Sequence, residues 1–377
     1  MHFTTLSHPR KLFVQLVFLA LSFLIGSLTK AQTVNVNSSL AKQLQERLDT
    51  SVDSSGAAGA VLFIQSPSFT WIGSSGFADL EQKRSMSTDD ALRLASMTKT
   101  FVSVTVLKLA EEGKIALDDP VTKYLSTPAV SAIPNSSEIS IRHLLAMTSG
   151  VFDYTDSDDY NDAIETFPER RPWKAEEVLA YIPLENALFL PGEGWSYSNS
   201  NYVLLDLLVK EVSGTSLASE IRRIIIDPLD LQHSFMEIQE PRPGGFGGLK
   251  VRGYEEGEDV TEIQDALGLG DGGLISTAYE VSQFLKALFT DKSLINDEML
   301  LEMRKFHPQE DYGLGLERRE TQFGTAWGHS GASSGFQGDM LYFPEKDFIF
   351  VLLSNTMDTD LCDIIFSETM DLINANE

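Results

Sequence analysis

The chain has few of the residues that form disulfides or bind metals. Only one of its 377 residues, Cys362, is a cysteine, so the fold has no internal disulfide. It has six histidines, none in a His-Glu-x-x-His pattern, and no cysteine cluster. We therefore expect no zinc site and no other cofactor.

Basic residues are also scarce. The chain has 29 Lys and Arg against 55 Asp and Glu, which gives a formal net charge of −26 at pH 7. An acidic surface repels a phosphate backbone, so we do not expect a nucleic-acid partner. The apolar fraction of 42% and the charged fraction of 22% are ordinary for a globular protein. The length allows one large domain or two lobes.

Long apolar runs are missing except near the start of the chain. Residues 12–25 form an almost unbroken apolar run after a short basic start, and Thr29 and Ala31 then place small residues at the two positions that a signal peptidase reads. The run is short for a membrane span, which needs roughly 20 residues. We interpret residues 1–31 as a signal peptide that is cleaved after Ala31, with an uncleaved anchor as the alternative. The mature chain, 32–377, is then exported, to the periplasm or the exterior, without a membrane span.

Apolar periodicity predicts strands toward both ends of the mature chain and helices between them. The expected strands cover 59–65, 69–72, 337–343 and 348–354. The expected helices begin near Ser39 and at Ser96, and cover 141–147, 202–212, 278–289 and 361–374. Because both ends supply strands and a helix, we expect a single α/β domain of the α+β type. Its sheet lobe would be built from about 32–95 and 325–377, and a helical lobe of about 96–324 would be inserted between them.

The first chemical pattern is Ser96-x-x-Lys99. Residues at positions i and i+3 share a helix face, so the Lys99 amine is expected beside the Ser96 hydroxyl. A serine hydroxyl needs an adjacent base to become a nucleophile, and a lysine can be that base if burial lowers its pKa. The same spacing recurs at Ser39 and Lys42, where the polar surroundings favour a helix cap and a solvated lysine.

The second pattern is Tyr197-x-Asn199. A tyrosine near a serine–lysine pair can relay protons as a general acid or base. The Asn199 amide can hold a substrate carbonyl and the lysine at once. The alternative interpretation is a polar loop that caps the helix expected from Tyr202.

The third pattern is His329-Ser330-Gly331. A donor followed by a hydroxyl and a glycine on a strand edge can bind a substrate carboxylate or carbonyl, because glycine lets the backbone approach closely. The alternative is a glycine-rich turn that leads into the strand expected from Gln337.

The three patterns in this order resemble the penicillin-recognising serine hydrolases, in the branch of class C β-lactamases, DD-carboxypeptidases and related esterases. The flanking segments 141–150 and 272–278 fit as well, and the resemblance runs from about Gly59 to about Asn355. It implies a β-lactamase/DD-peptidase-like fold, with a central antiparallel sheet flanked by helices and an inserted all-helical region.

The resemblance also implies a role for each site residue. Ser96 would be acylated, and Lys99 and Tyr197 would share the proton transfers. The remaining roles are substrate binding by Asn199, His329, Ser330 and Gly331, and an oxyanion hole made of the backbone N–H groups of Ser96 and Ala332.

One departure from the class C β-lactamases guides the substrate hypothesis. Those enzymes usually have lysine where His329 stands, and a neutral histidine holds a carboxylate less firmly. We therefore expect hydrolysis of a D-amino-acid peptide, of the DD-carboxypeptidase or D-peptidase type, or of a small ester, and cell-wall peptides are included as partners. A class C-like β-lactamase and a non-turnover penicillin-binding sensor remain the alternatives.

Two further patterns are interpreted as non-functional. Residues 331–335 match Gly-x-Ser-x-Gly, but a strand rather than a helix is expected after them and no later histidine exists. The acidic run from Asp153 to Asp162 lacks the glycine and glutamate of a calcium loop, and we expect a solvated acidic loop there.

Overall fold

The computed structural model describes most of the chain from Ser38 onward. The described residues are 38–166, 173–184, 187–237, 239–241, 250–262, 268–357 and 360–375. Residues 35–377 form one compact unit. The predicted signal peptide lies outside the described residues. Within these ranges, no helix combines the length and the apolar character needed to cross a bilayer.

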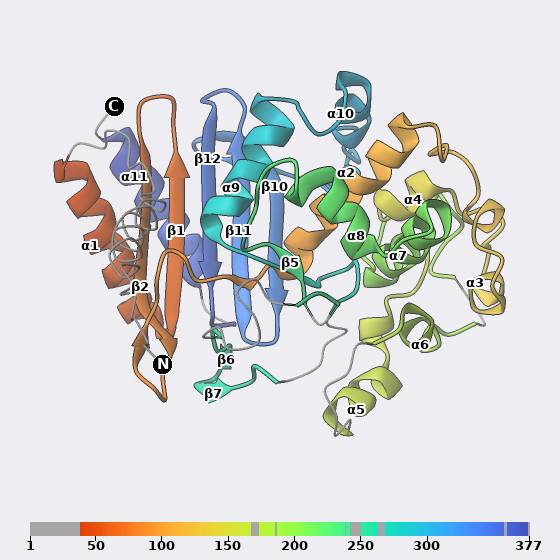
Figure 1. Ribbon diagram of the computed structural model, residues 1–377, viewed down its shortest axis with the longest axis horizontal. Helices are drawn as coiled ribbons and strands as arrows, with labels where there is room; N and C mark the ends of the chain where they lie inside the picture. The colour runs from red at the N-terminus through yellow and green to blue at the C-terminus, as the bar shows by residue number, and fades with distance from the viewer. Residues whose placement is uncertain are drawn as a thin grey trace, which may run out of the picture. The chain divides into compact units, whose positions relative to one another are not determined.

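A seven-stranded antiparallel sheet forms one part of this unit (Figure 1). Its strand order is β3-β2-β1-β12-β11-β10-β9. The strands are β1 (Gly59–Gln65), β2 (Thr70–Asp79), β3 (Arg84–Ser85), β9 (Glu317–Thr321), β10 (Gly324–Ser333), β11 (Phe336–Phe343) and β12 (Phe348–Ser354). The first and last strands of the chain, β1 and β12, pair directly at the centre, with Ala60 opposite Ser354. The two ends of the chain therefore build the sheet together, as expected.

Helices cover both faces of the sheet, so its central strands are apolar throughout. In β1, Ala60, Leu62 and Ile64 pack with α1 (Ser38–Ser55) and α11 (Leu361–Asn374). The alternate residues Val61 and Phe63 belong to the main core on the other face. Helix α9 (Ala278–Leu285) packs on that second face against β1, β11 and β12.

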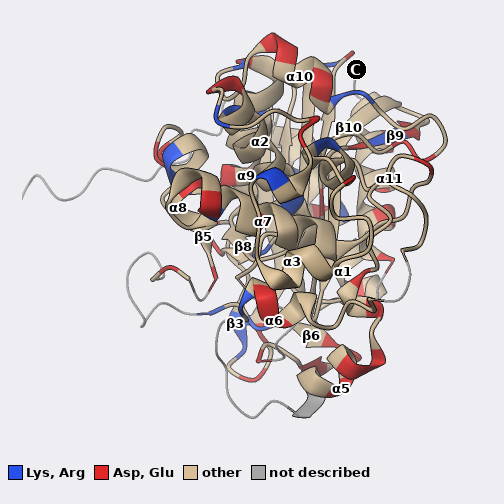
Figure 2. Ribbon diagram, turned by 90° about the vertical axis from the view of Figure 1, so that its right-hand side faces the viewer, with Lys and Arg blue, Asp and Glu red and all other residues tan. Residues whose placement is uncertain are grey.

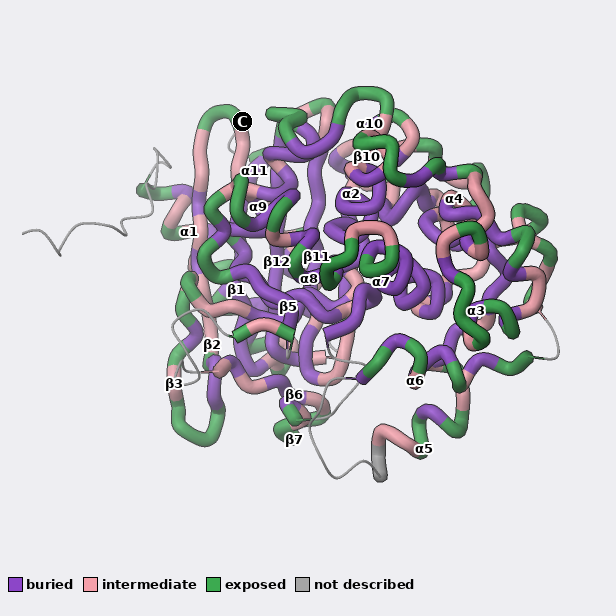
Figure 3. Tube along the Cα trace, turned by 45° about the vertical axis from the view of Figure 1, so that its right-hand side comes forward, coloured by how far each residue is buried: buried purple, intermediate pink, exposed green. Residues whose placement is uncertain are grey.

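The remaining helices gather beside the sheet (Figure 1). They are α2 (Thr98–Glu111), α3 (Pro128–Ala132), α4 (Ile141–Leu145), α5 (Asp158–Thr166), α6 (Ala175–Leu179), α7 (Asn199–Ser213), α8 (Leu217–Ile221) and α10 (Asp297–Met303). Helix α2 is buried on nearly all sides and packs against α7 and α8. In Figure 3 the traces of α2 and α7 are mostly coloured as buried. Acidic segments lie on α5, α6 and α10 (Figure 2), a distribution that disfavours phosphate-rich partners.

Two small sheets complete the fold. One has the order β4-β8-β5, built from β4 (Leu92–Arg93), β8 (Leu274–Ser276) and β5 (Phe235–Met236), and the other pairs β6 (Tyr254–Glu255) with β7 (Glu258–Asp259). Because β4 and β8 are antiparallel, the residues after β4 lie beside those before β8. The Leu94 N–H donates to the Leu274 carbonyl at 2.9 Å, which fixes this neighbourhood.

Two elements differ from the sequence predictions. Strand β9 falls within the segment assigned to the helical lobe, and α9, also assigned there, lies on the sheet. His329, Ser330 and Gly331 are part of strand β10 and do not form a turn before the next strand. The α/β fold with an antiparallel sheet and an adjacent helical region is confirmed.

Candidate active site

A sharp turn at the end of β4 presents Ser96. Ala95 has a φ of +47°, in the left-handed region that residues with a side chain rarely adopt. The chain then makes one 3₁₀ turn, Ala95–Met97, and continues into α2. This path places Ser96 at the start of a helix and Lys99 one turn later. Strain of this kind commonly gathers at functional sites.

Lys99 is fully buried, and three oxygen atoms surround its amine. The Lys99 Nζ lies 2.9 Å from Ser96 Oγ, 2.7 Å from Asn199 Oδ1 and 2.7 Å from the Asp271 carbonyl oxygen. The latter two oxygens can only accept hydrogen bonds. A neutral amine has two hydrogens and one lone pair, so when the hydrogens point to these two acceptors the lone pair faces the Ser96 hydroxyl.

Burial lowers the pKa of Lys99 from 10.5 to about 8, against the opposing charges of Asp271, Asp153 and Glu317. This shift corresponds to about 3 kcal/mol of differential interaction between the two protonation states. A substantial fraction of the amine is therefore neutral near pH 8 and can accept a proton. The expected serine–base pair is present in the geometry.

Tyr197 lies beside the same two residues. The Lys99 amine lies 5.0 Å from its ring centroid, and the Ser96 side chain acts to lower the pKa of its hydroxyl. Burial raises the pKa of Tyr197 well above its ordinary value, so the phenol stays protonated at neutral pH. A protonated phenol can donate a proton but cannot accept one readily, which favours the general-acid half of the predicted relay.

Asn199 contacts Lys99, as the sequence predicted. Its Oδ1 accepts from Lys99, and its Nδ2 donates to Asp153 Oδ2 at 2.9 Å. The backbone N–H of Asn199 donates to the same carboxylate oxygen at 3.0 Å. The amide is thus oriented between a cation and an anion, and it positions Lys99. Donation to Asp153 uses one of the two Nδ2 hydrogens, and the substrate-binding role of Asn199 stays a prediction.

His329 is buried rather than open to a substrate, with 1% of its surface exposed. Its Nδ1 lies 2.6 Å from the Ser330 carbonyl oxygen, an atom that only accepts, so Nδ1 carries the proton. The Tyr312 hydroxyl then donates to Nε2 at 3.0 Å. Burial lowers the pKa of His329, which keeps the ring neutral. The expected neutral histidine is present and contacts Tyr312, and its contact with a substrate stays a prediction.

Gly331 is where β10 approaches the nucleophile. A Cβ at this position would lie 2.3 Å from the Leu94 carbonyl oxygen and 3.2 Å from the Ser96 nitrogen. Only glycine lets the strand lie this close to the backbone before Ser96, and the substrate-binding role of Gly331 stays a prediction. Ala332 follows and is exposed. The Ser330 N–H points to the outer edge of β10. With the two-residue period of a strand, the Ala332 N–H faces the same edge.

Four residues that sequence analysis missed complete the cluster. They are Asp153, Asp271, Tyr312 and Glu317. Asp153 is buried and holds Asn199, which corrects its assignment to a solvated loop. Asp271 is held by the Tyr154 hydroxyl at 2.5 Å, and burial raises its pKa to about 6. No local pattern identifies these residues, because each reaches the site from a distant part of the chain.

The interpretations of Lys42 and of residues 331–335 agree with the structure. Lys42 is exposed and pairs with Glu46 on α1, as expected for a solvated lysine. Residues 331–333 are the last residues of strand β10 and residues 334–335 form the turn to β11, so this segment does not lead into a helix. Among the described residues, no group of three or more His, Cys, Asp or Glu side chains could hold a metal ion.

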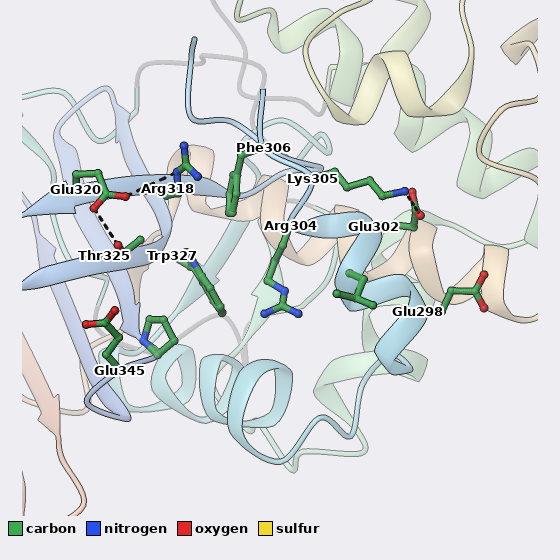
Figure 4. Close-up of a pocket in the computed structure, with 12 residues that line it drawn as sticks. Glu298, Glu302, Arg304, Lys305, Phe306, Arg318, Glu320, Thr325, Trp327 and Glu345 are labelled. Atoms are coloured by element: carbon green, nitrogen blue, oxygen red, sulfur yellow. Dashed lines mark hydrogen bonds and ion pairs between the residues drawn. The ribbon is translucent and has the colours of Figure 1, made fainter. Parts of the chain in front are cut away.

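A groove of about 820 Å³ lies elsewhere, between α10 and the β9–β10 edge (Figure 4). The Arg304 guanidinium lies 4.8 Å from the ring centroid of Trp327 in this groove. The described residues that line it include none of the predicted site residues. The groove is therefore distinct from the Ser96–Lys99 cluster.

A family comparison agrees with this site. The Beta-lactamase family model matches residues 44–364. The chain belongs to this family. The family and the amidohydrolases among the similar structures indicate a serine hydrolase.

One relative has low sequence identity to this chain over a long alignment. Penicillin-binding protein 4* of Bacillus subtilis (strain 168) is 25% identical over 338 residues, which cover 83% of this chain and 71% of that protein. Relatives from Staphylococcus aureus match at 30–31% identity, and the chain spans about a third of their length.

Two solved structures are similar over nearly their whole length. A D-stereospecific amidohydrolase from Streptomyces sp. superposes with a TM-score of 0.76 at 25% identity, covering 87% of this chain and 97% of that one. A D-amino acid amidase from Ochrobactrum anthropi SV3, complexed with L-phenylalanine amide, has a TM-score of 0.77 at 25% identity, covering 90% and 99%. Both similarities agree with the observed sheet and helical region.

Proposed function

We propose that the protein hydrolyses amides or esters of D-amino acids through an acyl-enzyme on Ser96. The observation that carries this proposal is the Lys99 amine, buried with a pKa of about 8, whose lone pair faces the Ser96 hydroxyl. The similarity to a D-stereospecific amidohydrolase and a D-amino acid amidase supports D-amino-acid substrates. The similarity to a penicillin-binding protein supports a penicillin as a second acylating reagent for Ser96.

The arrangement supports a two-step reaction. Ser96 Oγ attacks the substrate carbonyl carbon while Lys99 Nζ takes the hydroxyl proton. The leaving amine or alkoxide then takes a proton from the Tyr197 hydroxyl, which is re-protonated from Lys99. Water attacks the resulting ester while Lys99 Nζ removes a proton from it, and this proton passes to Ser96 Oγ as the bond to the acyl group breaks and the acid product leaves. The backbone N–H groups of Ser96 and Ala332 are proposed to stabilise the oxyanion.

The test is intact-mass spectrometry of the mature protein over time, after mixing with an activated ester of a D-amino acid and, separately, with a penicillin. We expect a transient adduct from the D-ester that maps to Ser96, with a shorter-lived or absent counterpart from the matched L-ester. A long-lived adduct from penicillin alone would favour a non-turnover sensor. Absence of any adduct on Ser96 would overturn the proposal.

We also propose that the protein is exported after cleavage at Ala31. The support is the apolar run at residues 12–25 and the small residues that follow it. Mass spectrometry of the N-terminus of the protein recovered from the medium or periplasm tests this proposal. A mature chain that begins at Gln32 supports it, and intact protein retained in the cytoplasm contradicts it.

A further inference from the structure

Glu317 directs its carboxylate at the polar groups of the His329-Ser330-Gly331 segment. The Ser330 N–H donates to Glu317 Oε2 at 3.2 Å, and the Ser330 hydroxyl donates to Oε1 at 3.1 Å. The His329 Nδ1 lies 3.3 Å from the same Oε1. A single carboxylate within the chain therefore occupies the donors that Ser330 could offer to a ligand.

These donors lie close to the nucleophile. Gly331, the next residue, packs against the backbone of Leu94 and Ser96. The β9–β10 pairing ends at Gly328, so the later part of β10 presents an edge that β9 does not cover. The Glu317 side chain is 21% exposed at this edge. A substrate bound to Ser96 that extends along β10 therefore meets Glu317.

The local charge is negative. His329 is neutral, and Arg319 is the cation of the group, paired with Glu317 at 3.1 Å and with Asp339 at 2.7 Å. Burial acts to raise the pKa of Glu317, but protonated His329, Arg319 and the Ser330 hydroxyl together hold it below its ordinary value, so the carboxylate is already ionised at neutral pH, where His329 has lost its proton. One cation facing two carboxylates leaves an excess of negative charge, which opposes a second carboxylate brought in by a ligand.

We propose that Glu317 is a built-in carboxylate that selects substrates with a neutral group on this side of the scissile bond. A carboxamide, an ester or an amidated peptide would be accepted. A substrate with a free carboxylate there would be rejected, because it meets a like charge and finds the Ser330 donors occupied. This inference rests on the proposed function, and it favours amidase, endopeptidase or esterase activity over carboxypeptidase activity.

The test uses two aryl esters of N-acetyl-D-alanine whose leaving groups are 3-hydroxybenzoate and 3-hydroxybenzamide. The two esters differ in one charge, and their rates of spontaneous hydrolysis correct for intrinsic reactivity. We expect the wild-type kcat/KM to favour the benzamide ester at least tenfold. In Glu317→Gln the ratio should fall toward one. Because both esters are compared on the same variant, any change in the Lys99 pKa cancels in the ratio.

The matched control is Glu320→Gln. Glu320 lies on the same strand, its side chain is 65% exposed, and it contacts Arg318 and Thr325 rather than Ser330. This control should retain the wild-type ratio. A wild-type ratio near one, or an unchanged ratio in a folded Glu317→Gln variant, would overturn the inference. If Glu317→Gln does not fold, the wild-type ratio alone tests the inference: at least tenfold supports it and a value near one overturns it. Failure of both esters to acylate Ser96 would instead refute the proposed function.

Discussion

Replacing Gly331 by alanine should separate β10 from the nucleophile. The added Cβ would lie 2.3 Å from the Leu94 carbonyl oxygen, whereas side-chain carbons essentially never approach closer than 3.0 Å. The strand or the Leu94–Ser96 segment must therefore move by roughly 1 Å. A misplacement of about 1 Å at reacting groups can cost on the order of 100-fold in rate. The strain itself should cost about 1–3 kcal/mol in the free energy of unfolding.

The assay combines kcat/KM for a D-amino-acid aryl ester with the denaturant midpoint of the same variant. Gly272→Ala is the matched control, since a Cβ at Gly272 also faces Ala95 but at 3.8 Å, an ordinary contact. We expect the control to lose little activity. Gly331→Ala with unchanged kcat/KM and unchanged stability would refute the argument that close approach of β10 shapes the site.

Three further predictions address the nucleophile, the base and the core. Ser96→Ala should abolish acylation and turnover while leaving the circular dichroism spectrum and melting temperature nearly unchanged; retained turnover would contradict the assignment. The wild-type kcat/KM should rise with pH through about 8, because Lys99 must lose its proton to act as a base. The charge of Asp271 raises the Lys99 pKa, so in Asp271→Asn the rise of kcat/KM with pH should occur roughly one pH unit lower. A rise that moves to higher pH in this variant would refute the electrostatic argument. Phe350→Ala removes a fully buried ring between the sheet and α11, and should cost about 3–5 kcal/mol in chemical unfolding; a loss below about 1 kcal/mol would contradict the packing.

Elements with strong local signals were predicted well. Strands β1 and β12 and helix α11 begin and end at the predicted residues. Each is long, strongly apolar or amphipathic, and bounded by turn residues or caps, so its own sequence is sufficient to define it. Strand β9 was missed because Glu317–Thr321 has the sequence Glu-Arg-Arg-Glu-Thr, which lacks apolar alternation. Strand β9 is at the edge of the sheet, where charged side chains are common. Such a strand is defined by its pairing with one neighbour, here β10, and not by an apolar pattern in its own sequence.

The amino-acid sequence by itself determined the serine–lysine pair, since the spacing of Ser96 and Lys99 places them on one helix face whatever surrounds them. Only the tertiary structure decided what that pair can do. Lys99 contacts Asn199 and Asp271, which are 100 and 172 residues away in the chain. These contacts orient the lone pair of its amine in a site from which water is excluded. The position of Glu317 beside Ser330 likewise depends on strand pairing. Desolvation and electrostatic interaction act through space, so a local pattern identifies the reacting groups but leaves their pKa values and neighbours to the fold.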